Sequence, residues 1–384
     1  MLKQKASEQR VLILGTSELA REVIKAIKAR PQCGYKIVGI VGEGRNVDIP
    51  DLHRPVAGYL DDLHRIIDEY RPDRIIVALA ERRQHLLVYH LIEARVHRGI
   101  LIEDAAEVYE RLLGKLSIET MTPSSVIFSR DFRPSEVSLA VSRSVSLLMA
   151  AAGLILFAPL FGLIALAIKL DSRGPVFFGH VRIGKGGKPF KLLKFRTMYP
   201  AAGKRSEWAR DNGDRITRVG RWLRKFRLDE LPQFVNVLRG DMNLVGPRPH
   251  PASNFELFLL VSRNAPECGR QIPYYSLRWM VRPGITGWAQ VRYRYANDLD
   301  EEIEKIRYDL HYIKNFSFWL DLRILLETVK TVLLGRESQA APEPSAKGMA
   351  SGLMRFEQEL TSASMAPVLP RAVPQGSTRA ESGE

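Results

Sequence analysis

The chain has 384 residues, a net charge of +14 and only two cysteines, Cys33 and Cys268. This length accommodates two domains and a tail, and two distant cysteines exclude a disulfide framework or a cysteine-based zinc site. Lys and Arg outnumber Asp and Glu by 57 to 43. We therefore expect an anionic partner, which can be a nucleic acid, an anionic lipid surface or a phosphorylated substrate.

The first 130 residues alternate short apolar segments with amphipathic helical patterns. Strands are expected at residues 11–14, 36–41, 74–79 and 100–102. Strands that alternate with helices predict a parallel sheet with helices on its faces. We therefore expect an α/β fold that begins with a Rossmann-like domain over residues 1–130.

The turn after the first strand is a degraded dinucleotide-binding fingerprint. It keeps Gly15 but has Ser17 and Ala20 where the later glycines would stand. Two interpretations are open: a pyrophosphate bound at the helix N-terminus, or an inherited turn in a sensory or scaffold domain that binds no nucleotide. The segment before this strand is charged and has no pattern of a cleavable signal peptide.

A polar, proline-containing connector over residues 131–141 leads to an apolar segment, residues 144–168, without a charged side chain. About 20 such residues suffice to cross a bilayer as a helix. Arg143 and Lys169 flank the segment, and Pro159 inside it would bend or break a helix. The segment can span the membrane, return as a re-entrant hairpin over residues 138–170, or form a buried core helix. We favour re-entry, because the regions on both sides have the character of cytoplasmic domains.

The region after this segment is strongly basic. Residues 173–227 contain 16 Lys and Arg but only three acidic residues. Next to an apolar segment, this excess favours anionic lipid or a phosphorylated substrate over nucleic acid. We expect residues 171–336 to form a compact, mostly helical domain, and residues 337–384 to be a mostly disordered tail rich in Ala, Pro, Ser and Gly.

Asp229 and Glu230 are adjacent carboxylates within this basic region. Aspartate is an established nucleophile toward phosphorus, and Mg²⁺ typically takes one or two carboxylates together with phosphate oxygens. A pair of this kind suits phosphoryl transfer, with one carboxylate attacking and the other holding the metal. A solvated surface pair on a basic helix is the alternative.

Several cations accompany this pair. Lys191, Lys194 and Arg196 alternate with apolar residues as in a half-buried strand, and Arg224 precedes Asp229 by about one helical turn. Arginine suits bidentate contact with phosphate. The alternative is that these cations only interact with the headgroups of anionic lipids.

Two rigid loops hold further candidates. Arg248 lies between two prolines, which would fix the backbone that presents it. Arg282 begins a glycine-containing loop. Its glycines would let the backbone approach a ligand closely, and the alternative is a structural turn. The eight histidines show no metal-binding spacing, and we expect His250, after the proline loop, to be structural.

Together these motifs strongly resemble those of bacterial polyprenyl-phosphate glycosyl-1-phosphate transferases. The resemblance runs from about Ser138 to Arg336. It rests on four motifs in the right order: KFRTM at 194–198, LDELPQ at 228–233, GDMNLVGPRP at 240–249 and RPGITGWAQ at 282–290.

The resemblance implies transfer of a sugar-1-phosphate from a UDP-sugar to undecaprenyl phosphate at the cytoplasmic face of the bacterial inner membrane. Asp229 would attack the sugar-proximal phosphorus, UMP would leave, and the lipid phosphate would attack the aspartyl phosphosugar. Glu230 would bind Mg²⁺. Arg224 matches a phosphate-binding position of the family. Asp309 matches a late acidic position, which we place among the substrate-binding residues.

The family's membrane helix is re-entrant and breaks at a proline, which Pro159 matches. The product would start synthesis of an exopolysaccharide, a capsule or an O-antigen, and a homodimer is compatible with the sequence. Long family members usually carry several transmembrane helices before the Rossmann-like domain, where this sequence begins.

Two other functions remain open at this stage. A nucleotide-sugar oxidoreductase would need an intact glycine fingerprint, and Tyr70 and Tyr109 have no lysine four residues on. A non-catalytic membrane scaffold or regulator that senses nucleotide through its N-terminal domain has no need of the carboxylate pair. We favour an enzyme with a regulatory N-terminal domain.

Overall fold

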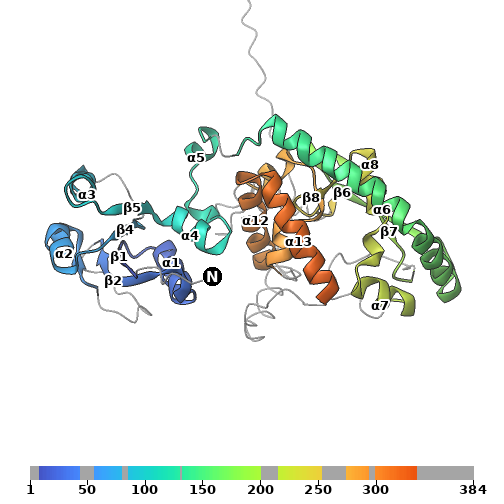
Figure 1. The fold of residues 1–384 in the computed structure, drawn as a ribbon, viewed down its shortest axis with the longest axis horizontal. Helices are drawn as coiled ribbons and strands as arrows, with labels where there is room; N and C mark the ends of the chain where they lie inside the picture. The colour runs from blue at the N-terminus through green and yellow to red at the C-terminus, as the bar shows by residue number, and fades with distance from the viewer. Residues whose placement is uncertain are drawn as a thin grey trace, which may run out of the picture. The chain divides into compact units, whose positions relative to one another are not determined.

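The structure is a computed structural model, which describes residues 8–43, 56–79, 85–129, 132–199, 215–252, 274–293 and 299–334. The tail predicted at residues 337–384 lies outside these residues. Figure 1 shows a mixed α/β protein with a sheet near the N-terminus and one long helix, α6.

The N-terminal part contains a parallel sheet of five strands in the order β3-β2-β1-β4-β5. The four strands predicted from the sequence are confirmed. The fifth, β3, is only two residues long, too short for an alternating pattern to reveal it. The strands are β1 (Gln9–Leu14), β2 (Tyr35–Gly42), β3 (Gly58–Tyr59), β4 (Arg74–Val77) and β5 (Leu101–Asp104).

Helices cover both faces of this sheet because side chains alternate along each strand. In β1, Val11 and Ile13 join the apolar core that contains α1 and α4. Leu12 and Leu14 join the opposite core, which contains α2 and α3. The helices of this part are α1 (Glu18–Lys28), α2 (Leu63–Tyr70), α3 (His85–Arg98), α4 (Ala105–Leu113) and α5 (Pro123–Ile127), with single 3-10 turns η1 (Pro31–Cys33), η2 (Leu60–Asp62) and η3 (Ile118–Thr120).

The turn at Gly15 has the tight geometry expected of a strand-to-helix connection. Gly15 has φ of 107°, and a Cβ there would lie 2.5 Å from the carbonyl oxygen of Ala78. Ser17 caps α1, accepting from the Ala20 amide at 3.3 Å, and its hydroxyl donates to the same Ala78 carbonyl at 2.6 Å. Nucleotide binding and an inherited turn that binds no nucleotide both stay as interpretations of this turn.

The helix α6 (Glu136–Asp171) contains the whole apolar segment predicted at residues 144–168. It begins within the predicted connector, because Ser135 caps it by accepting from the Ser138 amide at 3.1 Å. Among the described residues, α6 alone is long and apolar enough to cross a membrane, and only 11% of its most apolar stretch is buried. Pro159 lies inside it, and Figure 1 shows that α6 changes direction along its length.

The described residues after α6 are mostly helical, as predicted, but they also form four short strands. β6 (Phe177–Ile183) and β7 (Pro189–Phe195) form an antiparallel hairpin closed by η4 (Lys185–Gly187). β8 (Asn243–Val245) and β9 (Gly284–Thr286) pair in parallel. A strand near β7 was predicted and β6 was not, because the exposed side chains of β6 include apolar ones and hide the alternation.

Among the described residues, this part has two apolar cores. One includes the fully buried Val237, Met242 and Leu310, and the other joins the end of α6 to β7 and α7 through Ile168, Phe195 and Leu223. Leu228 and Leu231, on either side of the adjacent carboxylates, pack against the second core, which therefore helps to fix the candidate site. The elements are α7 (Arg218–Lys225), η6 (Leu228–Glu230), α8 (Gln233–Arg239), η7 (Tyr275–Met280), α11 (Trp288–Arg292), α12 (Leu299–Lys314) and α13 (Phe318–Leu334).

Candidate active site

Asp229 and Glu230 lie on the 3-10 turn η6, between two helices. α7 ends at Lys225, and Arg227 adopts a left-handed backbone conformation with φ of 54°. Such a conformation is uncommon for a residue other than glycine, and here it lies where the chain leaves α7. The helix α8 begins at Gln233, so neither carboxylate belongs to a regular helix. Each residue is only 8% exposed, which excludes the solvated surface pair.

Two cations from distant segments meet on Glu230. Lys194, near the end of β7, places Nζ 2.9 Å from Glu230 Oε1, and Arg248 places Nη2 2.8 Å from the same oxygen. Lys194 Nζ also lies 3.6 Å from Asp229 Oδ2. The structure therefore brings together four of the residues predicted for the site.

These surroundings shift the two carboxyl groups in opposite directions. Burial raises the pKa of Asp229, and Lys194 lowers it only in part. Burial also opposes ionisation of Glu230, but Arg248 and Lys194 outweigh it and hold the pKa of Glu230 well below its ordinary value. Glu230 is thus a fixed anion, while Asp229 offers a more basic oxygen.

Arg224, on α7, is the remaining cation predicted for the site near this pair. Its positive charge acts to lower the pKa of Asp229. Its Nη1 atom is buried and has no hydrogen-bond partner in the part of the chain that the structure describes. A buried donor without an acceptor is rare and costly. An anionic oxygen bound beside Asp229 would satisfy it.

The carboxylate pair also fits a magnesium ion. No group of three or more His, Cys, Asp or Glu side chains suited to a metal occurs in the described ranges. Mg²⁺ needs no such group, because it usually binds through one or two carboxylates and completes its shell with water and substrate phosphates. Both cations bind Oε1 of Glu230, so Oε2 of Glu230 takes part in neither contact.

Comparison with known proteins places this geometry in a family. The sequence profile of the family described as bacterial sugar transferase matches residues 137–335, just over half of the chain and all of the site. The chain belongs to the bacterial sugar transferase family. Membership of this family and the long apolar helix α6 together indicate that the protein associates with a membrane.

Curated relatives extend the similarity into the N-terminal part. A UDP-N-acetylgalactosamine-undecaprenyl-phosphate N-acetylgalactosaminephosphotransferase of Aeromonas hydrophila is 39% identical over 299 residues, 76% of this chain and 63% of that protein. A UDP-glucose:undecaprenyl-phosphate glucose-1-phosphate transferase of Escherichia coli (strain K12) is 31% identical over 336 residues, 84% of this chain and 67% of that protein. A protein of the same name from Caulobacter vibrioides is 46% identical over 181 residues, 46% of this chain and 64% of that protein. The chain thus spans roughly two thirds of the length of these relatives.

Two other cations predicted for the site make contacts within the protein. Arg196, 6% exposed, donates from Nη2 to the carbonyl of Ser172 at 2.6 Å, just after the end of α6. Its Nε and Nη1 atoms are buried without a partner among the described residues. Arg282 donates from Nε to the carbonyl of Gly240 at 3.1 Å. Contact of either residue with phosphate stays a prediction.

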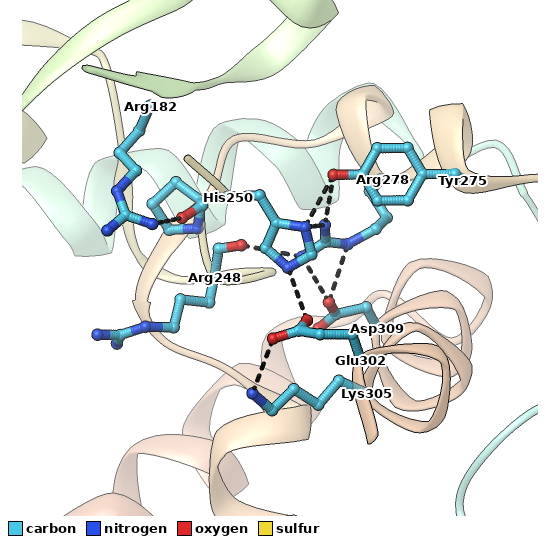
Figure 2. Close-up of polar contacts among 9 residues, drawn as sticks. Arg182, Arg248, His250, Tyr275, Arg278, Glu302, Lys305 and Asp309 are labelled. Carbon is cyan, nitrogen blue, oxygen red and sulfur yellow. Dashed lines mark hydrogen bonds and ion pairs between the residues drawn. The ribbon is translucent and has the colours of Figure 1, made fainter. Parts of the chain in front are cut away.

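A buried polar cluster, which we call the anchor cluster, lies behind the loop of Arg248 (Figure 2). Asp309 is only 2% exposed and its carboxylate lies 2.8 Å from Nη2 of Arg278. His250, expected to be structural, lies within this cluster. Sequence reasoning missed Arg278 and Glu302, since neither belongs to a recognisable spacing. The members of the anchor cluster are His250, Tyr275, Arg278, Glu302 and Asp309.

Proposed function

We propose that this protein transfers a sugar-1-phosphate from a UDP-sugar to undecaprenyl phosphate, through a covalent phosphosugar on Asp229. One observation carries the proposal: a buried Asp-Glu pair held by Lys194 and Arg248, beside an arginine with an unused donor. The activities named for the relatives from A. hydrophila and E. coli support both substrate classes.

In the first half-reaction, a carboxylate oxygen of Asp229 attacks the phosphorus that carries the sugar. An O–P bond to Asp229 forms, the P–O bond to the leaving nucleotide breaks, and UMP departs with the bonding electrons. This step needs charge neutralisation and positioning more than proton transfer. The buried site and its cations suit that requirement.

Each charged side chain has a distinct task in this step. Glu230 would hold Mg²⁺, which when bound offsets the negative charge of the diphosphate. Arg224 donates from Nη1 to a phosphate oxygen. Lys194 and Arg248 balance the charge of Glu230 in this structure, and we expect them to share their donors with the phosphate oxygens of the bound substrate.

In the second half-reaction, a phosphate oxygen of undecaprenyl phosphate attacks the same phosphorus. The O–P bond to Asp229 breaks, and the carboxylate is regenerated. A covalent intermediate lets a water-soluble donor and a membrane-bound acceptor use one site in turn. The product would start an exopolysaccharide, capsule or O-antigen.

The helix α6 would hold this site at the membrane surface. We propose that α6 is re-entrant at Pro159 and that the domain after it lies on the cytoplasmic side of the inner membrane. The internal proline and the low burial of α6 support this placement. A site at headgroup level would lie where the phosphate of the lipid acceptor lies.

The direct test is release of UMP from a panel of UDP-sugars by detergent-solubilised protein with undecaprenyl phosphate and Mg²⁺. We expect lipid-dependent UMP from at least one sugar, abolished by chelator and by Asp229→Asn. Asp68→Asn makes the same chemical change at an exposed carboxylate in α2 and should keep full activity. Full activity of Asp229→Asn would refute the covalent mechanism, and a folded chain that uses no UDP-sugar would refute the proposed reaction.

A further inference from the structure

In the loop that carries Arg248, two residues can be held by backbone hydrogen bonds only through their carbonyl groups. Pro247 and Pro249 have no backbone N–H, so neither can donate a hydrogen bond. All four carbonyls from residue 247 to residue 250 nevertheless accept one. In order, the donors are the Gly284 amide at 3.0 Å, Arg278 Nη2 at 2.9 Å, Arg182 Nη1 at 3.3 Å and the Ile183 amide at 3.1 Å.

Arg278 is the donor for the carbonyl of Arg248 itself. Its side chain is buried, and a buried cation is stable only when it is paired and hydrogen-bonded. Asp309, on α12, provides this pairing, because its Oδ2 lies 2.9 Å from Nε and 2.8 Å from Nη2 of Arg278. The same Nη2 therefore joins Asp309 to the backbone of the loop.

The third nitrogen of Arg278 is also occupied. Nη1 lies 2.9 Å from Nδ1 of His250, which accepts only when the imidazole is neutral and carries its proton on Nε2. That Nε2 lies 3.3 Å from Glu302 Oε2, and the Tyr275 hydroxyl lies 2.8 Å from Nδ1. Figure 2 shows His250, Arg278 and Asp309 meeting beside the backbone of Arg248, on the side away from its guanidinium. Each nitrogen of Arg278 thus has an acceptor within 3.0 Å.

The side chain of Arg248 points the other way, to the carboxylate pair. Its Nη2 donates to Glu230 Oε1 at 2.8 Å, while its carbonyl accepts from Arg278. A single residue therefore connects the anchor cluster with the site. A backbone held on one side and a guanidinium presented on the other is the arrangement expected of a pre-positioned ligand-binding arginine.

We propose that Arg278, held by Asp309, is a positioning residue that fixes the backbone of Arg248 and thereby directs the Arg248 guanidinium onto Glu230 and the substrate phosphates. This inference rests on the proposed function and deepens it. It gives Asp309 a role through Arg278, in place of direct contact with the substrate.

The proposal is tested by a double-mutant cycle on kcat/KM for UMP release. Arg278→Lys keeps the charge, but one ammonium cannot serve Asp309 and the Arg248 carbonyl in a planar fork. We expect it to lower kcat/KM by roughly 10- to 100-fold in the otherwise unchanged protein. In an Arg248→Ala background, where no guanidinium remains to be positioned, the same change should cost less than about twofold.

The anchor could instead matter only for folding, and the cycle separates these roles. The loss of thermal stability caused by Arg278→Lys should be alike in both backgrounds, whereas the loss of activity should not. Asp321→Asn is the matched control, because Asp321 is also buried and accepts from the hydroxyls of Ser142 and Tyr312. Its effect on activity should be the same in both backgrounds.

Equal losses of activity from Arg278→Lys in the two backgrounds would overturn the positioning role. If Arg278→Lys does not fold, Asp309→Asn enters the same cycle, with the same expected non-additivity. A wild-type chain without activity would overturn the proposed function and this inference together. Additive losses in an active enzyme would overturn this inference alone.

Discussion

Asn236 offers a quantitative test of how the site is assembled. This residue of α8 is fully buried, and its side chain joins α8 to β7. Oδ1 accepts from the Leu193 amide at 2.9 Å, and Nδ2 donates to the Lys191 carbonyl at 2.8 Å and to Asp241 Oδ2 at 3.0 Å. Lys194 follows directly in the chain, so these bonds also hold the strand that presents a cation to Glu230.

Asn236→Ala removes all three hydrogen bonds and leaves the Leu193 amide without its acceptor. At about 1 kcal/mol for each bond, the free energy of unfolding should fall by about 3 kcal/mol. Activity should also fall, because the position of Lys194 is no longer fixed from α8.

Urea unfolding of the detergent-solubilised protein measures this loss. Gln32→Ala is the control at an exposed amide side chain and should lower the free energy of unfolding by about 1 kcal/mol or less. A loss for Asn236→Ala as small as that of the control would refute this account of how β7 is held.

Three further predictions concern stability. Burial lowers the pKa of His250 from 6.5 to about 4, so the unfolded chain takes up its proton first as the pH falls. When the pH is lowered from 7.5 to 5, the free energy of unfolding measured in urea should fall by about 2 kcal/mol more in the wild type than in His250→Gln. Equal losses would contradict a neutral buried imidazole. Gly246→Ala would place Cβ 2.4 Å from a backbone carbonyl oxygen. It should reduce the stability of the fold by about 2 kcal/mol, which thermal unfolding would show as a lower melting temperature. Gly162→Ala, in open space, is its control, and equal melting temperatures would refute the close contact. Glu110→Gln removes the buried carboxylate that accepts from Lys314 at 2.7 Å and should also cost about 2 kcal/mol, so an unchanged melting temperature would be evidence against this link between α4 and α12.

The sequence was sufficient where the signal is local. The short apolar run of β1, the charge-free segment inside α6 and the adjacent carboxylates can each be read within a short window. Arg248 was also identifiable, because two prolines frame it.

Contacts between distant segments could not be predicted in the same way. Arg278 lies 31 residues before Asp309, and no periodicity relates them. The resemblance placed Asp309 among the substrate-binding residues, while the structure places its carboxylate on a buried guanidinium. Arg227 is a similar case, because its left-handed conformation, which puts the carboxylate pair on a turn, depends on packing rather than on a glycine.

The central claim is that Asp229 carries the sugar-phosphate between the two substrates. The most direct measurement is mass spectrometry of the protein after incubation with its UDP-sugar and Mg²⁺ in the absence of undecaprenyl phosphate. The account predicts a phosphosugar adduct on the peptide containing Asp229, lost on addition of the lipid and absent from Asp229→Asn. Turnover through a ternary complex, with no adduct and with activity retained in Asp229→Asn, would contradict it.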